Sequence, residues 1–185
     1  MQKDKLRKKQ LNYLKERDHK NDDFINFCVS QLSEFRKAKT VALFVSMPHE
    51  ISTRYLFDIC LYTKKQIVLP VITDEHEMQF YVYDQSKPLI KSQHFNVYEP
   101  DPNECKAVDG KEIDLMVLPG LAYDKHLNRL GYGKGFYDNY LKNYPNIFKV
   151  GIADHRMMVK YIETNPDDIA VNMVVLDNEI KEDLK

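Results

Sequence analysis

The chain has 185 residues and a formal net charge of −1, and hydrophobic residues make up 43% of it. This length suits one domain with a substantial core, so residues 1–185 are expected to form a single domain. The near-neutral charge argues against nucleic acid or an anionic membrane as a partner, and no apolar run is long enough to span a bilayer. The three cysteines lack metal-ligand spacing and no apolar signal segment follows the charged first residues, so a reducing, cytoplasmic location is expected.

The first third of the chain is predicted to be helical. Residues 2–17 carry leucines among basic residues, and residues 23–37 place apolar side chains at helical spacing. The candidate caps between the two segments are Asn21 and Asp22. The basic helix either presents a solvated face or brings Lys3 and Arg7, which are one helical turn apart, to the same phosphates.

Six short apolar runs are predicted to be strands: 40–46, 66–70, 78–83, 113–119, 148–153 and 170–176. Further helices are expected after a cap at Ser52 or Thr53, and over residues 136–144. The polar segment 84–111 contains three prolines and is expected to be irregular. Strands that alternate with helices indicate an α/β sandwich around a mostly parallel sheet. In such sheets, ligands bind at the carboxyl ends of the strands.

Two loops follow strands in this way, 46–52 and 119–135. Half of the six glycines lie within residues 128–138, at the end of the second loop, namely Gly131, Gly133 and Gly135. Closely spaced backbone N–H groups ahead of a helix form a site for anions, to which Lys134 and Arg129 can add charge. The spacing matches neither the Walker A nor the Rossmann motif. Phosphate binding and a tight strand–helix connection with a solvated lysine therefore both remain open.

Polar side chains near these loops have both an ordinary and a functional interpretation. Asp138, in the first helical turn, either pairs with the helix dipole or ligates Mg²⁺ together with phosphate oxygens. Glu50 is either a solvated loop carboxylate or grips a flat donor edge, such as an amino-pyrimidinone, with two hydrogen bonds. His49 and His126 are acid–base candidates by residue type alone.

Three separate stretches match the patterns of one known family. LPGLAYDKHLNRLGYGKGFYDNYL (118–141) satisfies throughout a pattern of roughly P-G-[LVI]-[AG]-[FY]-D-x-x-x-x-R-[LIM]-G-x-G-[KGR]-G-[FY]-Y-D. KDKLR (3–7) matches K-x-x-x-R, and FVSMPHEIST (44–53) matches F-x-S-x-x-x-E-[IV]-x-T. The chain therefore resembles the 5-formyltetrahydrofolate cyclo-ligase family, also called 5,10-methenyltetrahydrofolate synthetase, and the resemblance covers nearly the whole chain.

The resemblance implies an enzyme that uses ATP and Mg²⁺ to convert 5-formyltetrahydrofolate to 5,10-methenyltetrahydrofolate, releasing ADP and phosphate. It also implies a three-layer α/β/α, Rossmann-like fold around a mixed, mostly parallel sheet. The formyl oxygen is a poor leaving group, so we expect its phosphorylation, followed by ring closure by N10, without a protein nucleophile. The expected partners are these two small molecules, with neither nucleic acid nor membrane, and the expected state is a monomer.

The resemblance also implies the site residues, position by position. The implied ATP-binding residues are Lys3, Arg7, Arg129, Leu130, Gly131, Tyr132, Gly133, Lys134, Gly135, Phe136 and Tyr137. The implied folate-binding residues are Val45, Met47, Glu50, Tyr132, Gly133, Lys134, Gly135 and Phe136, with Glu50 on the pterin edge. The catalytic charge is assigned to Lys134 and Arg129, and the metal to Asp138 and Asn172. The expected apolar walls for the folate rings are Tyr123, Phe136 and Met47.

The chain departs from the family pattern in two places. Asn172 stands where the family usually has an aspartate that is implicated in magnesium binding, and an amide oxygen can coordinate without bringing charge. The glutamine that usually follows the penultimate strand is missing, and His155 or Arg156 is the candidate replacement. The change at Asn172 keeps open a non-catalytic nucleotide- or folate-binding module. A second alternative is a sugar-phosphate isomerase or acyl-transfer enzyme that uses the same anion loop without nucleotide hydrolysis.

Overall fold

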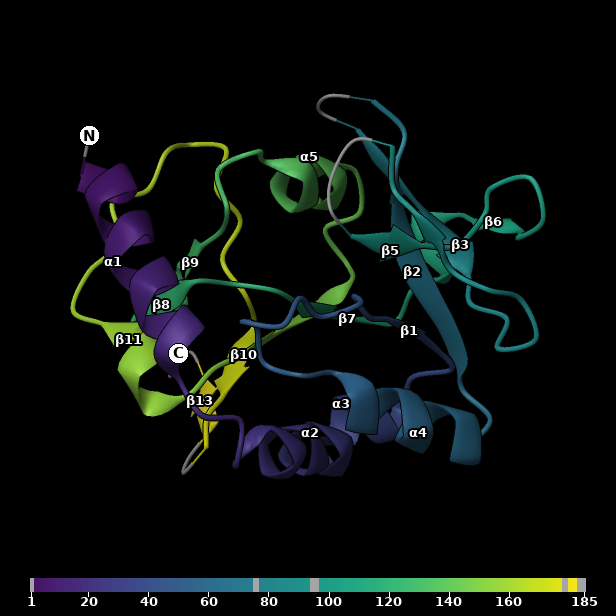
Figure 1. The fold of residues 1–185 in the computed structure, drawn as a ribbon, viewed down its shortest axis with the longest axis horizontal. Coiled ribbons are helices and arrows are strands. Elements are labelled where there is room, and N and C mark those ends of the chain that lie inside the picture. Colours follow the sequence, from purple (N-terminus) through teal and green to yellow (C-terminus); the bar gives the residue numbers. More distant parts are fainter. Residues whose placement is uncertain (1, 75–76, 94–96, 178–179, 183–185) are drawn as a thin grey trace.

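In the described part of the chain, three helices precede the first strand, and the two later helices each lie between strands (Figure 1). The computed structural model describes residues 2–74, 77–93, 97–177 and 180–182. Its helices are α1 (Gln2–Glu16), α2 (Asp22–Gln31), α3 (Ser33–Lys37), α4 (Arg54–Tyr62) and α5 (Phe136–Asn143), with short 3₁₀ helices at Gly110–Glu112 and His155–Met157. Its strands are β1 (Thr40–Ala42), β2 (Gln66–Ile72), β3 (Met78–Val82), β4 (Ile90–Lys91), β5 (Tyr98–Glu99), β6 (Ala107–Val108), β7 (Leu115–Leu118), β8 (Ala122–Asp124), β9 (Arg129–Leu130), β10 (Phe148–Ile152), β11 (Met158–Val159), β12 (Met173–Val175) and β13 (Ile180–Glu182).

The main sheet is mixed and mostly parallel, as predicted. Its eight strands have the order β13-β12-β10-β7-β1-β2-β3-β6. The five central strands, β12 to β2, pair in parallel, whereas β13 at one edge and β3 and β6 at the other are antiparallel. All residues of β1, β7 and β12 are buried, which is why these strands read as continuous apolar runs.

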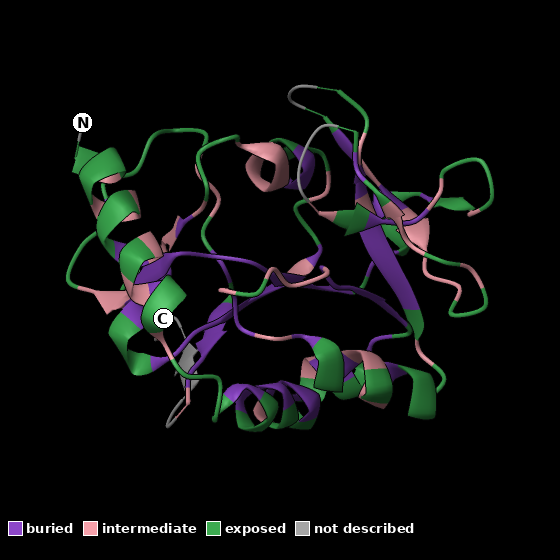
Figure 2. Ribbon diagram, viewed as in Figure 1, coloured by how far each residue is buried: buried purple, intermediate pink, exposed green. Residues whose placement is uncertain are grey.

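The helices form two layers around this sheet. In Figure 1, α2, α3 and α4 lie along one side of the sheet and α5 lies on the opposite side, which confirms the three-layer arrangement. Helix α1 stands at one end, beside the small sheet β11-β8-β9. Figure 2 shows that the strands between the two layers are buried, whereas much of α1 is exposed. Among the described helices, none combines the length and the apolarity needed to cross a bilayer.

Several element boundaries differ from the sequence predictions. The helix predicted over 23–37 is broken at Leu32, whose extended backbone (φ −61°, ψ 139°) separates α2 from α3. The strand predicted over 40–46 ends its regular pairing at Ala42. The segment 84–111, predicted to be irregular, contains β4, β5 and β6, although residues 94–96 lie outside the described part of the chain. The added strands form by pairing with other segments, β6 with β3 and β4 with β5, which outweighs local propensity.

A buried charged network anchors the C-terminal end of α1. The Arg17 guanidinium contacts Asp22 at 2.5 Å and Asp154 at 3.0 Å, and all three side chains are at most 7% exposed. The Tyr13 hydroxyl donates to the same Asp154 carboxylate at 2.6 Å, and Asp22 also accepts the backbone N–H of Ser52. Removing one partner of such a buried pair typically costs about 3–5 kcal/mol. The network therefore fixes α1 against α2 and the end of β10.

Candidate active site

One cavity of about 900 Å³ lies at the carboxyl ends of the central strands. Phe44 and Val45 beyond β1, Ile72 at the end of β2, and Pro119 beyond β7 all line it. Both loops that the sequence indicated as ligand sites therefore border the same space. The volume is at the upper end of the range for ligand sites, which is enough for a large ligand or for two smaller ones side by side.

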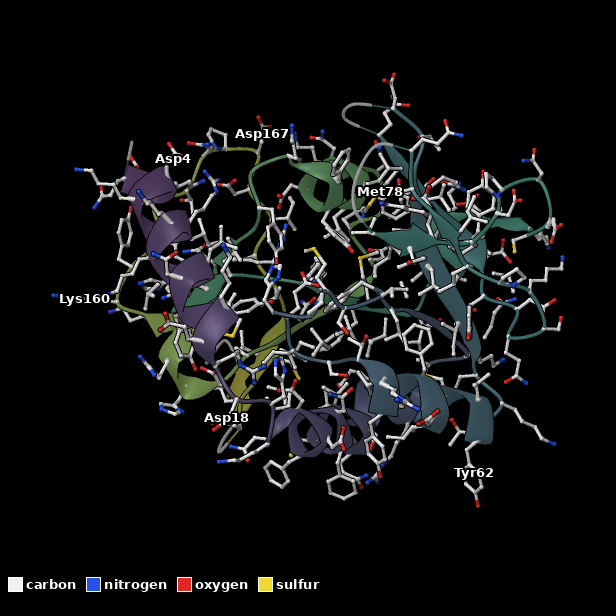
Figure 3. The ribbon with its side chains drawn as sticks, in the orientation of Figure 1. Asp4, Asp18, Tyr62, Met78, Lys160 and Asp167 are labelled. Atoms are coloured by element: carbon white, nitrogen blue, oxygen red, sulfur yellow. The ribbon has the colours of Figure 1, made fainter. Side chains whose placement is uncertain are left out.

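The cavity has one polar wall and one apolar wall. Helix α1 and the loop that leads into α5 supply basic and acidic side chains, whereas β2, β3 and β5 supply Pro70, Ile72, Met78 and Tyr98. Figure 1 shows α1 at one end of the molecule and the β2–β3 hairpin at the other, with α5 between them. Figure 3 labels one lining residue from each wall, Asp4 and Met78. The space can thus hold a ligand, or a pair of ligands, with one charged and one apolar part.

The turn before α5 needs glycine for its backbone conformation. Gly133 (φ +98°) and Gly135 (φ +76°) both adopt the left-handed region, which costs other residues about 1–2 kcal/mol. Gly135 is also the N-cap of α5, so the turn delivers the chain directly into a helix N-terminus beside the cavity. A side chain at Gly131 would lie 2.9 Å from Nη1 of Arg129, so this third glycine makes room for that arginine.

Arg129 joins the end of β7 to the start of α5. Its side chain is only 4% exposed. Nη1 donates to the Pro119 carbonyl oxygen at 3.1 Å and Nη2 to Oδ2 of Asp138 at 3.0 Å, while the guanidinium carbon lies 5.6 Å from the centre of the Tyr137 ring. Oδ1 of Asp138 accepts the backbone N–H of Ile169 at 3.1 Å. Arg129 and Asp138 therefore hold the glycine loop closed against the sheet.

A second set of hydrogen bonds connects the 46–52 loop to the glycine loop. Glu50 is buried; its Oε2 accepts the Met47 backbone N–H at 2.7 Å and its Oε1 accepts the Tyr132 hydroxyl at 2.8 Å. Nε2 of His49 lies 3.2 Å from the same hydroxyl oxygen, and since that hydroxyl donates to Glu50, the imidazole is the donor to it. Burial raises the pKa of Glu50, which the two hydrogen bonds partly oppose. Burial, and then the charge of Lys15, lower the pKa of His49.

The first two turns of α1 lie against the glycine loop. Nε of Arg7 donates to the Gly131 carbonyl oxygen at 3.1 Å, and its Nη1 contacts Asp4 at 2.7 Å. Nζ of Lys3 contacts Oδ2 of Asp168 at 2.5 Å. The contacts with Gly131 and Asp168 join residues more than 120 positions apart, and they bring the N-terminal K-x-x-x-R pattern to the glycine loop.

Carboxylates outnumber basic side chains around the cavity. The basic lining residues are Lys3, Arg7, Arg129 and Lys134, and the acidic ones are Asp4, Glu50, Glu99, Asp138, Glu163 and Asp168. Carboxylates already contact Lys3, Arg7 and Arg129, in the pairs Lys3–Asp168, Arg7–Asp4 and Arg129–Asp138. A polyanion that enters this space must therefore either exchange partners with these carboxylates or bring a cation with it.

The structure brings together nearly all the predicted site residues. Apart from Asn172, every residue predicted to bind ATP, folate or metal lines the cavity: Lys3, Arg7, Val45, Met47, Glu50 and the whole run from Arg129 to Asp138. His49 also lines it, whereas His126 does not. Their roles toward particular ligands stay predictions.

Asn172 lies elsewhere, and its expected role needs correction. It directly precedes β12, at the amino end of the parallel strands, whereas the cavity lies at their carboxyl ends. Its Oδ1 accepts the Lys149 backbone N–H at 2.8 Å, and its own N–H donates to the Lys149 carbonyl oxygen. Asn172 is therefore not a ligand of a metal bound in this cavity. It pairs the starts of two neighbouring strands instead.

Two other expectations also fail. Tyr123 was expected to form an apolar wall, but it is fully buried, and its hydroxyl donates to the Leu118 carbonyl oxygen at 3.1 Å. Its ring fills the space that side chains at Gly120 and Gly151 would take. His155 and Arg156 do not replace the missing glutamine in the cavity, because His155 contacts Asp177 and Arg156 lies over the Tyr13 ring.

Several lining residues escaped sequence reasoning. They are Pro70, Ile72, Met78, Val97, Tyr98, Glu99, Asn139, Glu163, Asn165 and Asp168. Glu99 is buried and accepts the Ile72 backbone N–H at 3.3 Å. Residues 66–70 and 78–83 were predicted only as strands, and no local pattern shows which residues of 97–99 or 163–168 fold back onto the cavity.

One carboxylate that was predicted to ligate magnesium, that of Asp138, lines the cavity. No cluster of three or more His, Cys, Asp or Glu side chains suited to a metal occurs in the described part of the chain. Asp138 lines the cavity, and each of its oxygens accepts one hydrogen bond from the protein, which leaves lone pairs for a cation. Mg²⁺ typically takes one or two carboxylates, with water and phosphate oxygens as its other ligands. The single carboxylate of Asp138 is enough for that pattern, provided that the phosphates come with the substrate.

Comparison with known proteins points to one family. Residues 2–177 match the family model described as the 5-formyltetrahydrofolate cyclo-ligase family. The 5-formyltetrahydrofolate cyclo-ligase of Haemophilus influenzae is 32% identical over 89% of this chain and 89% of that protein. The NMR structure of 5,10-methenyltetrahydrofolate synthetase from Aquifex aeolicus aligns with a TM-score of 0.85 at 27% identity, over 100% of this chain and 94% of that one.

The comparisons do not fix a cellular compartment. The mitochondrial 5-formyltetrahydrofolate cyclo-ligase of Arabidopsis thaliana is 25% identical over 83% of this chain and 65% of that protein. The cytoplasmic location inferred from the sequence therefore stays a prediction.

The burial of Glu50 predicts a pH-dependent stability difference. Because its folded-state pKa is raised, the ionised carboxylate opposes folding; this cost is absent below the unfolded pKa and grows as the pH rises through the folded pKa. Glu50→Gln removes the ionisation. The free energy of unfolding of the variant, minus that of wild type, should increase as the pH rises above about 4.3, the pKa of an unfolded glutamate. Urea denaturation at several pH values measures it, and a difference that stays constant or falls would contradict the assignment.

Proposed function

Because this chain belongs to the 5-formyltetrahydrofolate cyclo-ligase family and converts 5-formyltetrahydrofolate to 5,10-methenyltetrahydrofolate, we propose that its cavity holds ATP and the folate side by side. The family implies ATP as the co-substrate. In the proposed arrangement, the polar wall binds the nucleotide and the apolar wall binds the folate. The observation that carries this proposal is that the glycine loop and the Glu50 loop border one space.

The chemistry requires activation of the formyl oxygen. The formyl group on N5 is an amide, so N10 cannot expel its oxygen as oxide at neutral pH. We infer that the oxygen first attacks the γ-phosphorus of ATP, and that the bond from this phosphorus to the bridging oxygen breaks to release ADP. N10 then attacks the formyl carbon, its proton is lost, and the C–O bond breaks to release phosphate. The protein must position the reactants and stabilise charge, and no protein nucleophile is needed.

The polar wall suits the phosphates. The turn at Gly133 and Gly135 leads into the N-terminus of α5, where backbone N–H groups and the helix dipole favour an anion. Lys3, Arg7 and Lys134 line the same wall. In the proposed complex, Lys134 lies at the transferred phosphoryl group and Arg129 acts mainly by holding the loop, because its guanidinium is already engaged by Pro119 and Asp138.

The other wall suits the folate. A pterin presents an amino group and a ring N–H as adjacent donors, and a carboxylate accepts such a pair with two parallel hydrogen bonds. Glu50 is the buried carboxylate of the 46–52 loop, and Val45 and Met47 border the cavity beside it. Its existing contacts with Met47 and Tyr132 fix its orientation while leaving lone pairs for a ligand.

Magnesium is proposed to accompany ATP. The acidic excess around the cavity means that a polyanion binds more easily with a divalent cation. When bound, the ion would neutralise charge on the phosphates, and Asp138 would be its protein ligand. The Arg129 contact orients the Asp138 carboxylate at the start of α5.

An omission experiment tests the proposed reaction. The purified chain with ATP, Mg²⁺ and 5-formyltetrahydrofolate should produce methenyltetrahydrofolate, followed by its near-ultraviolet absorbance. Omitting ATP, the folate or the metal should abolish the signal. Equal turnover without ATP would reject phosphoryl transfer, and turnover that is unchanged by a chelator would reject the role of Mg²⁺.

The proposed role of Lys134 predicts a large kinetic effect. Lys134→Ala should lower kcat/KM for ATP by about 10²–10³, the range typical for losing one contact to developing charge. Lys160→Ala removes a lysine outside the cavity and should have little effect. A loss below about threefold at Lys134 would remove it from its assigned role.

The proposed role of Glu50 predicts selectivity between the substrates. Glu50→Gln keeps the shape of the side chain but replaces one acceptor oxygen by a donor, which would oppose the pterin amino group. Steady-state kinetics should therefore show KM for the folate rising more than KM for ATP. Equal increases in both would argue against a pterin contact.

A further inference from the structure

We propose that Asp168 is a positioning residue for the nucleotide, because it holds Lys3 at the polar wall and so docks the first turns of α1 beside the glycine loop. The proposal rests on the proposed function, in which Lys3 reaches the ATP phosphates. Asp168 lies outside the three stretches that carry the family patterns, so no motif assigns it a role.

The contact is direct and long-range. Nζ of Lys3 contacts Oδ2 of Asp168 at 2.5 Å, and the side chains are 15% and 28% exposed. The same Oδ2 accepts the Asn165 backbone N–H at 2.6 Å, and the Asp168 N–H donates to the Asn165 carbonyl oxygen. The turn from Asn165 to Asp168 therefore orients the carboxylate independently of its contact with Lys3. Burial acts to raise the pKa of Asp168, but the contacts from Lys3 and Asn165 lower it overall, so the carboxylate is ionised at neutral pH.

Asp168 is also coupled to the rest of the polar wall. The next residue, Ile169, donates its N–H to Oδ1 of Asp138, whose Oδ2 contacts Arg129. One continuous path thus runs from Lys3 through Asp168 and Asp138 to Arg129, at the base of the glycine loop. The loop that follows β11 and the first turn of α5 are therefore positioned together with α1.

The N-terminal end of α1 depends on such contacts. Gln10 and Leu14 are the buried residues of this helix, and both lie in its C-terminal half. Ahead of them, Leu6 packs partly against the core, and the polar contacts of Lys3 and Arg7 reach across to the wall. Losing the Asp168 carboxylate would thus loosen the turn that carries both basic residues of the K-x-x-x-R pattern.

The neighbouring residue provides a matched control. Asp167 contacts Lys142 at 2.8 Å and its side chain is 77% exposed. Figure 3 shows Asp167 at the outer edge of the molecule, and it does not line the cavity. Asp168→Asn and Asp167→Asn therefore remove the same charge, one position apart, with and without a contact to Lys3.

A double-mutant cycle tests whether Asp168 acts through Lys3. We expect Asp168→Asn and Lys3→Ala each to raise KM for ATP about tenfold, within the range for a charge-assisted contact. The double variant should be no worse than Lys3→Ala alone, since the two residues act as one unit. Asp167→Asn should leave KM within about twofold, a change of less than 0.5 kcal/mol.

Hydrogen exchange supplies a readout that is independent of activity. In the ATP-free protein, backbone amides of residues 6–10 should exchange faster in Asp168→Asn than in wild type. Their exchange rates in Asp167→Asn should equal those of wild type. Asp168→Glu, which keeps the charge, should retain most of the protection, and far-UV circular dichroism checks that each variant is folded.

Additive effects on KM, or unchanged exchange in α1, would overturn the proposal, because Asp168 would then act only on its own turn. Failure of the proposed function gives a different result: wild type itself would show no ATP dependence, while the exchange difference between the two asparagine variants would persist.

Discussion

The buried guanidinium of Arg129 is the constraint on which the site depends. A buried cation is costly unless its hydrogen bonds are met. Two of those of Arg129 are met at otherwise separate elements, by the Pro119 carbonyl after β7 and the Asp138 carboxylate in α5, whereas its Nε is buried without a hydrogen-bond partner among the described residues. The chain between these two elements must then turn tightly beside the arginine. Gly131 leaves the space, and the positive φ angles of Gly133 and Gly135 allow the turn. The glycine spacing and the buried arginine therefore depend on each other.

Helix α1 forms the opposite part of the polar wall, and its two ends are held by different kinds of contact. At its C-terminal end, Arg17 is buried between Asp22 and Asp154. At its N-terminal end, Lys3 and Arg7 make partly exposed contacts with Asp168, Asp4 and the Gly131 carbonyl. Local opening is easier where fewer groups are buried. The end of the helix that faces the proposed nucleotide is thus held by partly exposed polar contacts rather than by burial.

Sequence reasoning could place the strands, the two strand-end loops and the glycine turn, because each has a local signature of apolar runs, caps or glycines. It could not place features that depend on the assembled fold. The pairing of Lys3 with Asp168 and the cavity lining that includes Met78 and Glu99 need contacts between distant segments. The error at Tyr123 has the same origin. An aromatic residue in a short strand faces either the core or the ligand, and only the surrounding glycines Gly120 and Gly151 decide which.

The position of Asn172 bears on whether the chain is a catalyst or only a binding module. The non-catalytic alternative rested on the loss of an aspartate at this position. In the structure, Asn172 precedes β12 and its amide oxygen accepts the Lys149 N–H, so it lies at the edge of the sheet opposite to the cavity. An aspartate there could accept the same hydrogen bond, and the substitution therefore removes a charge without removing a group from the cavity. The carboxylates that do face the cavity, Asp138 and Asp168 among them, are intact. The departure from the family pattern thus gives no physical reason for a loss of activity.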